Sequence, residues 1–361
     1  MSMTDGAALA PSVSVVICAY TEHRWDDLRS AVESVLGQTH HPLELIVVID
    51  HNEALLARSS HAFSSVPEGY IRVLANERRR GLSGARNTAI AAASGQVVAF
   101  LDDDAVAAPD WLESLLVHYS DPSVMGVGGV AQPQWPDRHT RPVTLPAAPG
   151  ALGELDWVVG CSYAGLPTSV APLRNLMGCN MSIRAAAFET VGGFRETIGR
   201  IGRTPLGDEE TELCIRVRQQ LPGSEFIHEP AARVVHRMTA DRLTWRYLLH
   251  RGYAEGLSKA AISSMVGPDD ALASERTYVA SVLPRAVLRE LRRCNRAGAL
   301  GAAAVLAVGA VTAFGYARGL ARVLRSATTS REVQPAAPVP RADHAEAPAE
   351  LAKITVPSAA R

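Results

Sequence analysis

The first two thirds of the chain alternate short apolar runs with segments whose apolar positions have a helical period. Residues 12–20 read SVSVVICAY, a run rich in β-branched residues, which is typical of a strand buried on both faces of a parallel sheet. Residues 28–36 then place apolar side chains on one face of a helix. Together the two segments predict one β-α unit.

The same alternation continues along the chain. Further short apolar runs occur at residues 43–49, 70–74 and 97–101, and helical stretches at residues 84–93 and 111–119 lie between or after them. Strands that alternate with helices predict an open, mostly parallel sheet with helices on its faces. The expected fold class is therefore α/β and Rossmann-like, with a helical extension at the C-terminal end.

Polar residues follow three of these predicted strands. They are Tyr20 to Glu22, Asp50, and Asp102 to Asp104. Ligands of such sheets bind in the crevice at the carboxyl ends of the strands. We therefore expect a ligand site where these three strand ends meet.

The composition narrows the class of protein. A chain of 361 residues with 47% hydrophobic content can bury a substantial core, and its net charge of -1 provides no basic field that would attract nucleic acid. The five cysteines are scattered without a Cys-x-x-Cys pair, which favours buried thiols in a reducing compartment over zinc or redox chemistry. Residues 1–11 lack a basic start followed by an apolar run, so we expect no secretory signal and a cytoplasmic active site.

The rest of the chain differs in charge and in periodicity. Residues 132–172 are rich in Pro and Gly, as expected of loops over a substrate site. Residues 233–296 hold twelve basic and six acidic residues, a local excess of +6. Residues 297–317 carry no charge and are long enough to cross a bilayer, although a buried helix packed on the catalytic domain is an alternative. The Ala/Pro-rich residues 327–361 predict disorder.

The sharpest chemical signal is the sequence FLDDDA at residues 100–105. Its three adjacent carboxylates, Asp102, Asp103 and Asp104, repel one another unless they share a cation. Carboxylates are the hard oxygen ligands that suit Mg²⁺ or Mn²⁺, and such a metal would neutralise a departing diphosphate. A solvated acidic turn that caps the next helix is the structural alternative.

A second acidic group opens a predicted helix at residues 207–213, which read GDEETEL. Acidic residues at a helix N-terminus are ordinary partners of the helix dipole. One of them, Asp208, Glu209 or Glu210, can instead take the proton of an acceptor hydroxyl as that hydroxyl attacks the anomeric carbon of a sugar. Attack on the face opposite the diphosphate would invert the anomeric configuration.

Two basic features complete the candidate chemistry. Residues 78–87 (RRRGLSGARN) predict a basic, glycine-bearing loop that runs into a helix, which suits phosphate or ribose oxygens but is also common in solvated loops. His236 follows an apolar run and lies among arginines. A histidine in such a place is either structural or, as a neutral imidazole, a metal ligand.

In chain order these segments resemble glycosyltransferase family 2, whose members share the GT-A fold and use nucleotide diphosphate sugars, usually with inversion. The matching pieces are SVVICAYTE, the strand-end Asp50, RGLSGARN, FLDDDA, MGCNMSIRAAAFETVGGFRE and GDEETELCIR. The resemblance covers residues 12–237 and implies that they form the catalytic domain. Residues 238–296 would then be a basic helical extension, followed by the apolar helix and the tail.

The resemblance also implies roles for residues by their position in these motifs. The residues expected to contact the nucleotide sugar are Ala19, Tyr20, Glu22, Asp50, Ser83, Arg86, Asp102, Asp103 and Asn180. The residues expected to hold Mn²⁺ or Mg²⁺ are Asp104, Asp102 and His236. Glu210 aligns with the catalytic base, but the family's usual Glu-Asp pair reads Glu209-Glu210 here, so Glu209 and Asp208 stay candidates.

Residues 237–259 and the apolar helix look like the tail of actinobacterial and archaeal family members that transfer sugars to lipid-linked acceptors such as glucosyl dolichyl phosphate. A basic stretch beside a weakly apolar helix would hold the enzyme at an anionic leaflet. We therefore predict metal-dependent, inverting transfer from a nucleotide sugar, with a UDP-sugar favoured, to a glycan or lipid-linked acceptor. The expected location is the cytoplasmic face of the cell membrane, peripherally or through a single C-terminal helix.

Two other functions stay open at this point. They are a non-catalytic, membrane-associated scaffold that binds a sugar nucleotide, and glycosylation of a soluble small molecule. A scaffold has no chemical need for both the Asp-x-Asp motif and a carboxylate at the base position. A nucleotidyltransferase or a nicotinamide dehydrogenase is disfavoured, because no glycine-rich loop follows the first strand.

Overall fold

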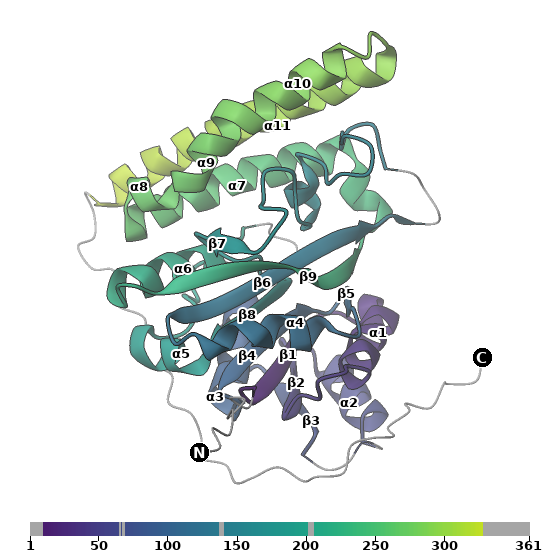
Figure 1. Ribbon diagram of the computed structural model, residues 1–361, viewed down its shortest axis with the longest axis vertical. Coiled ribbons are helices and arrows are strands. Elements are labelled where there is room, and N and C mark those ends of the chain that lie inside the picture. The colour runs from purple at the N-terminus through teal and green to yellow at the C-terminus, as the bar shows by residue number, and fades with distance from the viewer. Residues whose placement is uncertain (1–9, 65, 67–68, 137–140, 201–205, 328–361) are drawn as a thin grey trace, which may run out of the picture.

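A computed structural model describes residues 10–64, 66, 69–136, 141–200 and 206–327, and its main element is a curled mixed sheet (Figure 1). The predicted α/β fold is confirmed. The first four strands pair in parallel in the order β3-β2-β1-β4. Their bounds are Val13–Ala19 for β1, Glu44–Ile49 for β2, Ile71–Ala75 for β3 and Val97–Asp102 for β4.

The far half of the sheet adds antiparallel pairing that the alternation of strands and helices did not predict. Next to β4 come β8 (Asn180–Arg184) and β6 (Val124–Gln134), both in antiparallel pairings. Strand β9 (Glu225–Arg237) runs parallel to β6 and carries the short β5 (Ala105–Ala107) on its other edge, while β7 (Ala171–Leu173) pairs with it near its start.

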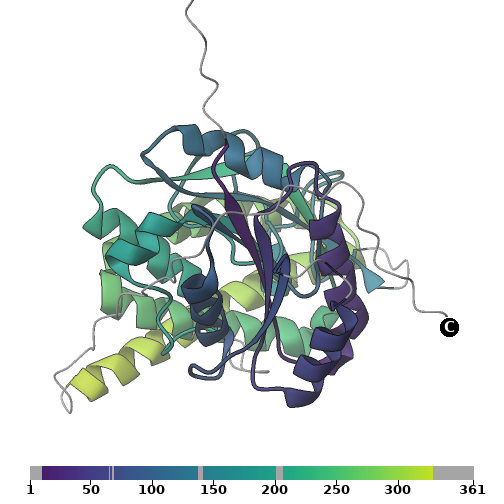
Figure 2. The same cartoon turned by 90° about the horizontal axis from the view of Figure 1, so that it is seen from below.

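Two apolar cores lie on opposite faces of this sheet. Alternate residues of β1 point to different cores, with Val15 and Ile17 in one and Val16 in the other, which explains why the strand is apolar without alternation. The first core is covered by α1 (Trp25–Leu36), α2 (Glu53–Ala62) and α4 (Trp111–Leu116). The second is covered by α3 (Leu82–Ala92), α5 (Ala185–Val191) and α6 (Glu209–Gln220). Figure 2 shows α1 and α3 on opposite sides of the parallel strands.

The C-terminal helices form a further layer beyond β6 and β9 (Figure 1). It contains α7 (Trp245–Val266), the short α8 (Pro268–Ala271) and α9 (Ala273–Thr277), a π-helical turn at Tyr278–Val282, α10 (Leu283–Leu291) and α11 (Arg296–Ala327). This layer includes both the basic extension and the apolar residues 297–317. The tail predicted to be disordered, residues 327–361, lies outside the described residues apart from Ala327.

Helix α11 packs on α7 through glycines on both helices. A Cβ on Gly256 of α7 would lie 2.1 Å from the Thr312 carbonyl oxygen, and one on Gly315 of α11 would lie 2.2 Å from the Tyr253 carbonyl oxygen. The two backbones therefore touch, as they do in small-xxx-small helix pairs. Helix α11 also exposes large apolar side chains, namely Leu300, Leu306, Phe314 and Leu324.

Candidate active site

A cavity of about 1040 Å³ runs along the carboxyl ends of the parallel strands and continues toward α11. Its inner end is lined by Ala19 after β1, Asp50 after β2 and Asp102 at the end of β4. The meeting of these three strand ends was predicted from the sequence, and Glu210 at the start of α6 faces the same cavity. The outer end is formed by helices α7, α9 and α11, so one cavity joins the sheet to the helical layer.

Asp102, Asp104 and His236 form a cluster that fits a metal ion. One ligand atom from each of the three lies within 4.8 Å of the others. Sheet pairing brings them together, because β5 begins directly after Asp104 and pairs Ala105 with His236 on β9. Asp102 and Asp104 are 2 positions apart and His236 follows Asp104 by 132 positions, yet the three residues meet at the carboxyl ends of β4 and β9.

The imidazole of His236 lies close to both carboxylates of this cluster. His236 Nε2 lies 2.8 Å from Asp104 Oδ1 and 3.9 Å from Asp102 Oδ2. These three residues would hold a divalent ion through two carboxylate oxygens and one imidazole nitrogen. The imidazole nitrogen adds a ligand type that suits Mn²⁺ better than Mg²⁺, which prefers oxygen alone.

Two arginines that the sequence analysis did not select hold the carboxylates of this cluster. Arg242 Nη2 lies 3.0 Å and Arg24 Nη1 lies 3.2 Å from Asp104 Oδ2. Burial opposes ionisation of Asp104, but His236 and the two guanidinium groups outweigh it and hold the pKa of this carboxyl well below its usual range. Asp104 is therefore ionised at neutral pH, as a metal ligand must be.

The middle carboxylate, Asp103, lines the cavity and pairs with Arg24. Its Oδ1 lies 2.7 Å from Arg24 Nη1, and its Oδ2 has no hydrogen-bond partner among the described residues. Burial raises the pKa of Asp103 to about 7. Asp103 therefore positions Arg24 at the cavity wall, and the two outer residues of the Asp-x-Asp motif belong to the cluster with His236.

The three candidates for the catalytic base have different surroundings. Glu209 Oε1 lies 2.9 Å from Arg86 Nη1, and Asp208 Oδ1 lies 3.3 Å from Lys259 Nζ. The carboxylate of Glu210 forms no ion pair with any residue that the structure describes, and it is half-buried in the cavity wall. Burial, reinforced by Glu209 and Asp208, raises the pKa of Glu210 to about 8. Burial also raises the pKa of Asp208, to about 7, so Glu210 is distinguished from Asp208 and Glu209 by the absence of an ion pair with a described residue.

The predicted nucleotide contacts divide into two groups. Ala19 and Tyr20 line the cavity, and the Tyr20 ring is stacked against the Arg24 guanidinium at 5.6 Å. Asp50 also lines it, but its carboxylate already accepts hydrogen bonds from Asn76 Nδ2 at 2.6 Å and Gly81 N at 2.9 Å. Asp50 therefore shapes the loop before α3 as well as the cavity. Glu22 is exposed and lies outside the cavity lining.

Three further residues expected to contact the nucleotide sugar, Arg86, Ser83 and Asn180, form hydrogen bonds within the protein. Arg86 lines the cavity and bridges Glu209, the Gly178 carbonyl oxygen and, at 3.7 Å, Asp102. The sugar contacts expected of Ser83 and Asn180 stay predictions, and both side chains already bond to other parts of the chain. Ser83 Oγ donates to the Ile198 carbonyl oxygen, and the buried Asn180 amide is fully bonded between Trp111 Nε1 and two strand carbonyls. Neither side chain belongs to the cavity lining.

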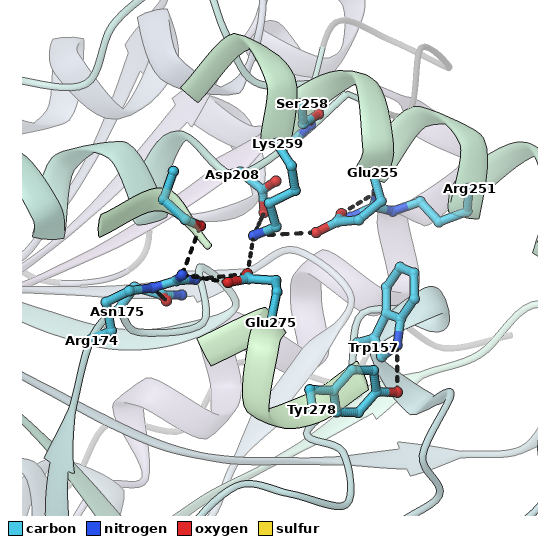
Figure 3. A network of polar contacts seen from close by, with 12 residues as sticks. Trp157, Arg174, Asn175, Asp208, Arg251, Glu255, Ser258, Lys259, Glu275 and Tyr278 are labelled. Atoms are coloured by element: carbon cyan, nitrogen blue, oxygen red, sulfur yellow. Dashed lines mark hydrogen bonds and ion pairs between the residues drawn. The ribbon is translucent and has the colours of Figure 1, made fainter. Parts of the chain in front are cut away.

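A cluster of charged residues lines the cavity between Glu210 and the helical layer, and sequence reasoning missed it. Its members are Arg174, Asp208, Arg251, Glu255, Lys259 and Glu275 (Figure 3). The basic excess of the extension was the only sequence signal for it, because its members come from four separate parts of the chain.

Comparisons with known proteins agree with this geometry. Residues 14–192 match the family described as Glycosyl transferase family 2. The chain is 32% identical over 313 residues to the Glucosyl-dolichyl phosphate glucuronosyltransferase of Haloferax volcanii, with 85% of this chain and 96% of that protein covered. It is 28% identical over 206 residues to the Pre-mycofactocin glycosyltransferase of Mycobacterium tuberculosis, with 55% of this chain and 39% of that protein covered.

A solved structure shares the fold at low identity. It is the mannosyltransferase PcManGT from Pyrobaculum calidifontis, in complex with GDP-Man and Mn²⁺. The TM-score is 0.54 and the sequence identity is 19%, over 89% of this chain and 84% of that one. The GT-A fold expected from the motifs is therefore confirmed.

Proposed function

The chain belongs to glycosyltransferase family 2 and is a glycosyltransferase, and from this premise we propose that it transfers a sugar to a hydroxyl of a lipid-linked acceptor with inversion. The proposed donor is a nucleoside diphosphate sugar, with a UDP-sugar first on the family resemblance. The observation that carries the proposal is that Glu210, Asp102 and His236 line one cavity, with Asp104 beside them at 2.8 Å from His236 Nε2.

The proposed metal site would be formed by Asp104, His236 and Asp102. A bound Mn²⁺ or Mg²⁺ would supply positive charge to the diphosphate as it leaves. Arg24 and Arg86 line the same part of the cavity, and their guanidinium groups are suited to phosphate oxygens. The Tyr20 ring at the cavity edge is suited to stack on the nucleotide base.

Glu210 is the proposed general base. As the acceptor oxygen forms its bond to the anomeric carbon, the bond from that carbon to the diphosphate oxygen breaks, and the hydroxyl proton passes to Glu210. Attack from the side opposite the diphosphate inverts the anomeric centre. Arg86 supports this arrangement by holding Glu209 through Nη1, which leaves Glu210 as the carboxylate directed at the acceptor.

A lipid-linked acceptor is supported by the helical layer at the outer end of the cavity. The relative from Haloferax volcanii, which this chain covers almost fully, is named for glucosyl-dolichyl phosphate. Helix α11 is apolar and long enough to cross a membrane over Arg296–Arg325. Its glycine contacts with α7 favour a helix that lies on the membrane surface while it stays packed on the enzyme. We propose the cytoplasmic face as the location.

The proposed donor and metal sites are tested together by thermal melting with a panel of sugar nucleotides. A ligand that binds only the folded state raises the melting temperature. We expect one donor, in the first instance a UDP-sugar, to raise it in the presence of Mn²⁺ and to lose this effect when a chelator is added. A shift that persists in chelator would contradict the metal site, and no shift with any donor would contradict the proposed donor class.

A further inference from the structure

The charged cluster defined above lies in the cavity wall beside the proposed base. Lys259 Nζ is at its centre, 2.9 Å from Glu275 Oε1, 3.3 Å from Asp208 Oδ1 and 3.4 Å from Glu255 Oε1 (Figure 3). Asp208 lies two residues before Glu210, so an anion at Lys259 would be close to the reacting hydroxyl.

Glu275 occupies the position that an external anion would take. Its two oxygens accept a two-pronged contact from Arg174, at 2.5 Å from Nη1 and 2.8 Å from Nη2, and one of them also contacts Lys259. This is the geometry with which guanidinium and ammonium groups bind a phosphate. Glu275 comes from the five-residue helix α9, and its side chain is 27% exposed, against 8% for Asp208. It is the carboxylate of the cluster that is most easily displaced.

A second observation points to a ligand at this place. Arg251 is buried and lines the cavity, yet its Nε has no hydrogen-bond partner among the described residues. Its Nη1 contacts Glu255 at 2.8 Å, and its guanidinium lies over the Trp157 ring at 5.9 Å. A buried donor without a partner costs free energy unless a ligand satisfies it.

The cavity becomes apolar beyond this cluster. Tyr163 and Tyr278 form an edge-to-face pair with ring centroids 5.5 Å apart, and Val282 and Leu283 follow on the adjoining helices. The opposite wall is the buried side of α11, including Val308 and Tyr316. A cationic seat for an anion therefore leads directly into an apolar groove, and the groove ends at α11, which also exposes apolar residues.

We infer that Arg174, Arg251 and Lys259 form the seat for the phosphate of an isoprenoid phosphate, whose chain lies in the groove between the Tyr278–Val282 turn and α11. Glu275 holds this seat until the lipid phosphate displaces it. The inference rests on the proposed lipid-linked acceptor, and it explains how the sugar carried by such a lipid would be presented to Glu210. The charge of the seat and the apolar wall beside it match the two parts of this ligand.

The test measures binding without donor or metal, so that it does not depend on catalysis. Farnesyl phosphate is titrated calorimetrically into the full-length protein. Farnesol, which lacks the phosphate, and inorganic phosphate, which lacks the isoprenoid, are the two controls. We expect farnesyl phosphate to bind at least about tenfold more tightly than either control, because neither control can use both parts of the site.

The decisive variant is Glu275→Gln, with Asp269→Asn as its matched control. Glu275 competes with the ligand for Arg174 and Lys259, so its neutral replacement should tighten farnesyl phosphate binding several-fold. Asp269 lies on the preceding helix with its side chain 88% exposed, and its replacement should change nothing. If the cluster is only a brace between helices, Glu275→Gln will weaken binding or leave it unchanged, and the inference is overturned.

Two further variants locate the two parts of the ligand. Lys259→Met should lower affinity for farnesyl phosphate by about tenfold or more, since it removes a charged contact. Val282→Asp should lower affinity for farnesyl phosphate but not for inorganic phosphate, whereas Val117→Asp, at an exposed site outside the cavity, should affect neither.

The outcomes separate this inference from the proposed function. If inorganic phosphate binds as tightly as farnesyl phosphate and Val282→Asp has no effect, the seat takes a free phosphate and the lipid assignment is wrong. If farnesol binds as tightly as farnesyl phosphate, there is no phosphate seat. If no donor raises the melting temperature but farnesyl phosphate binds, the metal-dependent donor site is overturned and the lipid seat stands. If a donor raises the melting temperature but farnesyl phosphate does not bind, only the seat is overturned.

Discussion

At the scale of single residues, the chemistry depends on how each carboxylate is paired. Asp104 is held by a histidine and two arginines, Glu209 by Arg86 and Asp208 by Lys259. Glu210 forms no ion pair with a described residue, and its pKa is raised where the pKa of Asp104 is lowered. Neighbouring acidic residues can therefore serve as metal ligand, as structural partner and as base.

The raised pKa of Glu210 predicts the pH dependence of transfer. A base works in its deprotonated form, so kcat/KM should increase with pH up to about 8 and then level off. Initial rates measured across a series of buffers at constant metal concentration will show this increase of kcat/KM with pH. A rate that is already constant above pH 5 would mean that the base has an ordinary carboxyl pKa and would exclude Glu210 in this environment.

Asp104→Asn tests the metal site at the same scale. It removes one anionic ligand and leaves Arg24 and Arg242 without their shared partner. We expect the Mn²⁺-dependent rise in melting temperature with the donor to disappear. Asp110→Asn, an exposed replacement at the start of α4 without a side-chain cap bond, should retain that rise. A full donor response in Asp104→Asn would remove Asp104 from the metal site.

The sequence was informative about residues that lie at strand ends and poor about residues whose role depends on distant partners. Asp102, Asp104 and His236 were predicted from motif and position, and they meet in the structure. Asn180 also matched the motif, but Trp111 and two strand carbonyls use its amide. Arg24 and Arg242 gave no signal, because their partner Asp104 lies 80 and 138 positions away in the chain.

At the scale of elements, helix and strand contacts fix the site through backbone geometry. The β5 and β9 pairing sets the distance from Asp104 to His236, and the α7 and α11 contact forms the outer wall of the cavity. The parallel half of the sheet was predictable from alternating apolar runs. The antiparallel half was not predictable in this way, because β8 pairs with β4 and β6, and both of these strands are distant from it in the sequence.

The glycine contacts between α7 and α11 can be tested with two alanine replacements on one helix. Gly315→Ala should lower stability by roughly 1–3 kcal/mol, because its Cβ would lie 2.2 Å from the Tyr253 carbonyl oxygen. Gly309→Ala should be neutral or stabilising by up to about 1 kcal/mol, since the nearest atom to its Cβ is 3.8 Å away and alanine favours helix. Equal effects in urea unfolding would contradict close packing of α11.

At the scale of the whole molecule, the proposed donor and acceptor ends of the cavity lie on different layers. The sheet supplies the end proposed for the metal and the nucleotide, and the C-terminal helices supply the other end and exposed apolar residues. Composition alone predicted an apolar C-terminal helix, but not its contact with α7. That contact depends on glycines whose partners lie in another helix.

Membrane association is the prediction that belongs to this scale. The exposed apolar residues of α11, together with the basic excess of the extension, should give binding to vesicles that contain anionic lipid. In a flotation assay, Leu306→Asp and Phe314→Asp should each reduce binding, and Val117→Asp should not. Alkaline carbonate should release the bound protein from the vesicles. Retention after carbonate washing would instead show that α11 spans the bilayer.

The central claim is that Glu210 is the base of a metal-dependent transfer reaction. The most direct test measures donor binding and sugar transfer side by side for the wild type, Glu210→Gln and Glu209→Gln, with glucosyl farnesyl phosphate as acceptor and the donor identified by melting. The account predicts that Glu210→Gln binds the donor normally and transfers at least about a hundredfold more slowly. Normal transfer by Glu210→Gln, together with loss of transfer in Glu209→Gln, would contradict it.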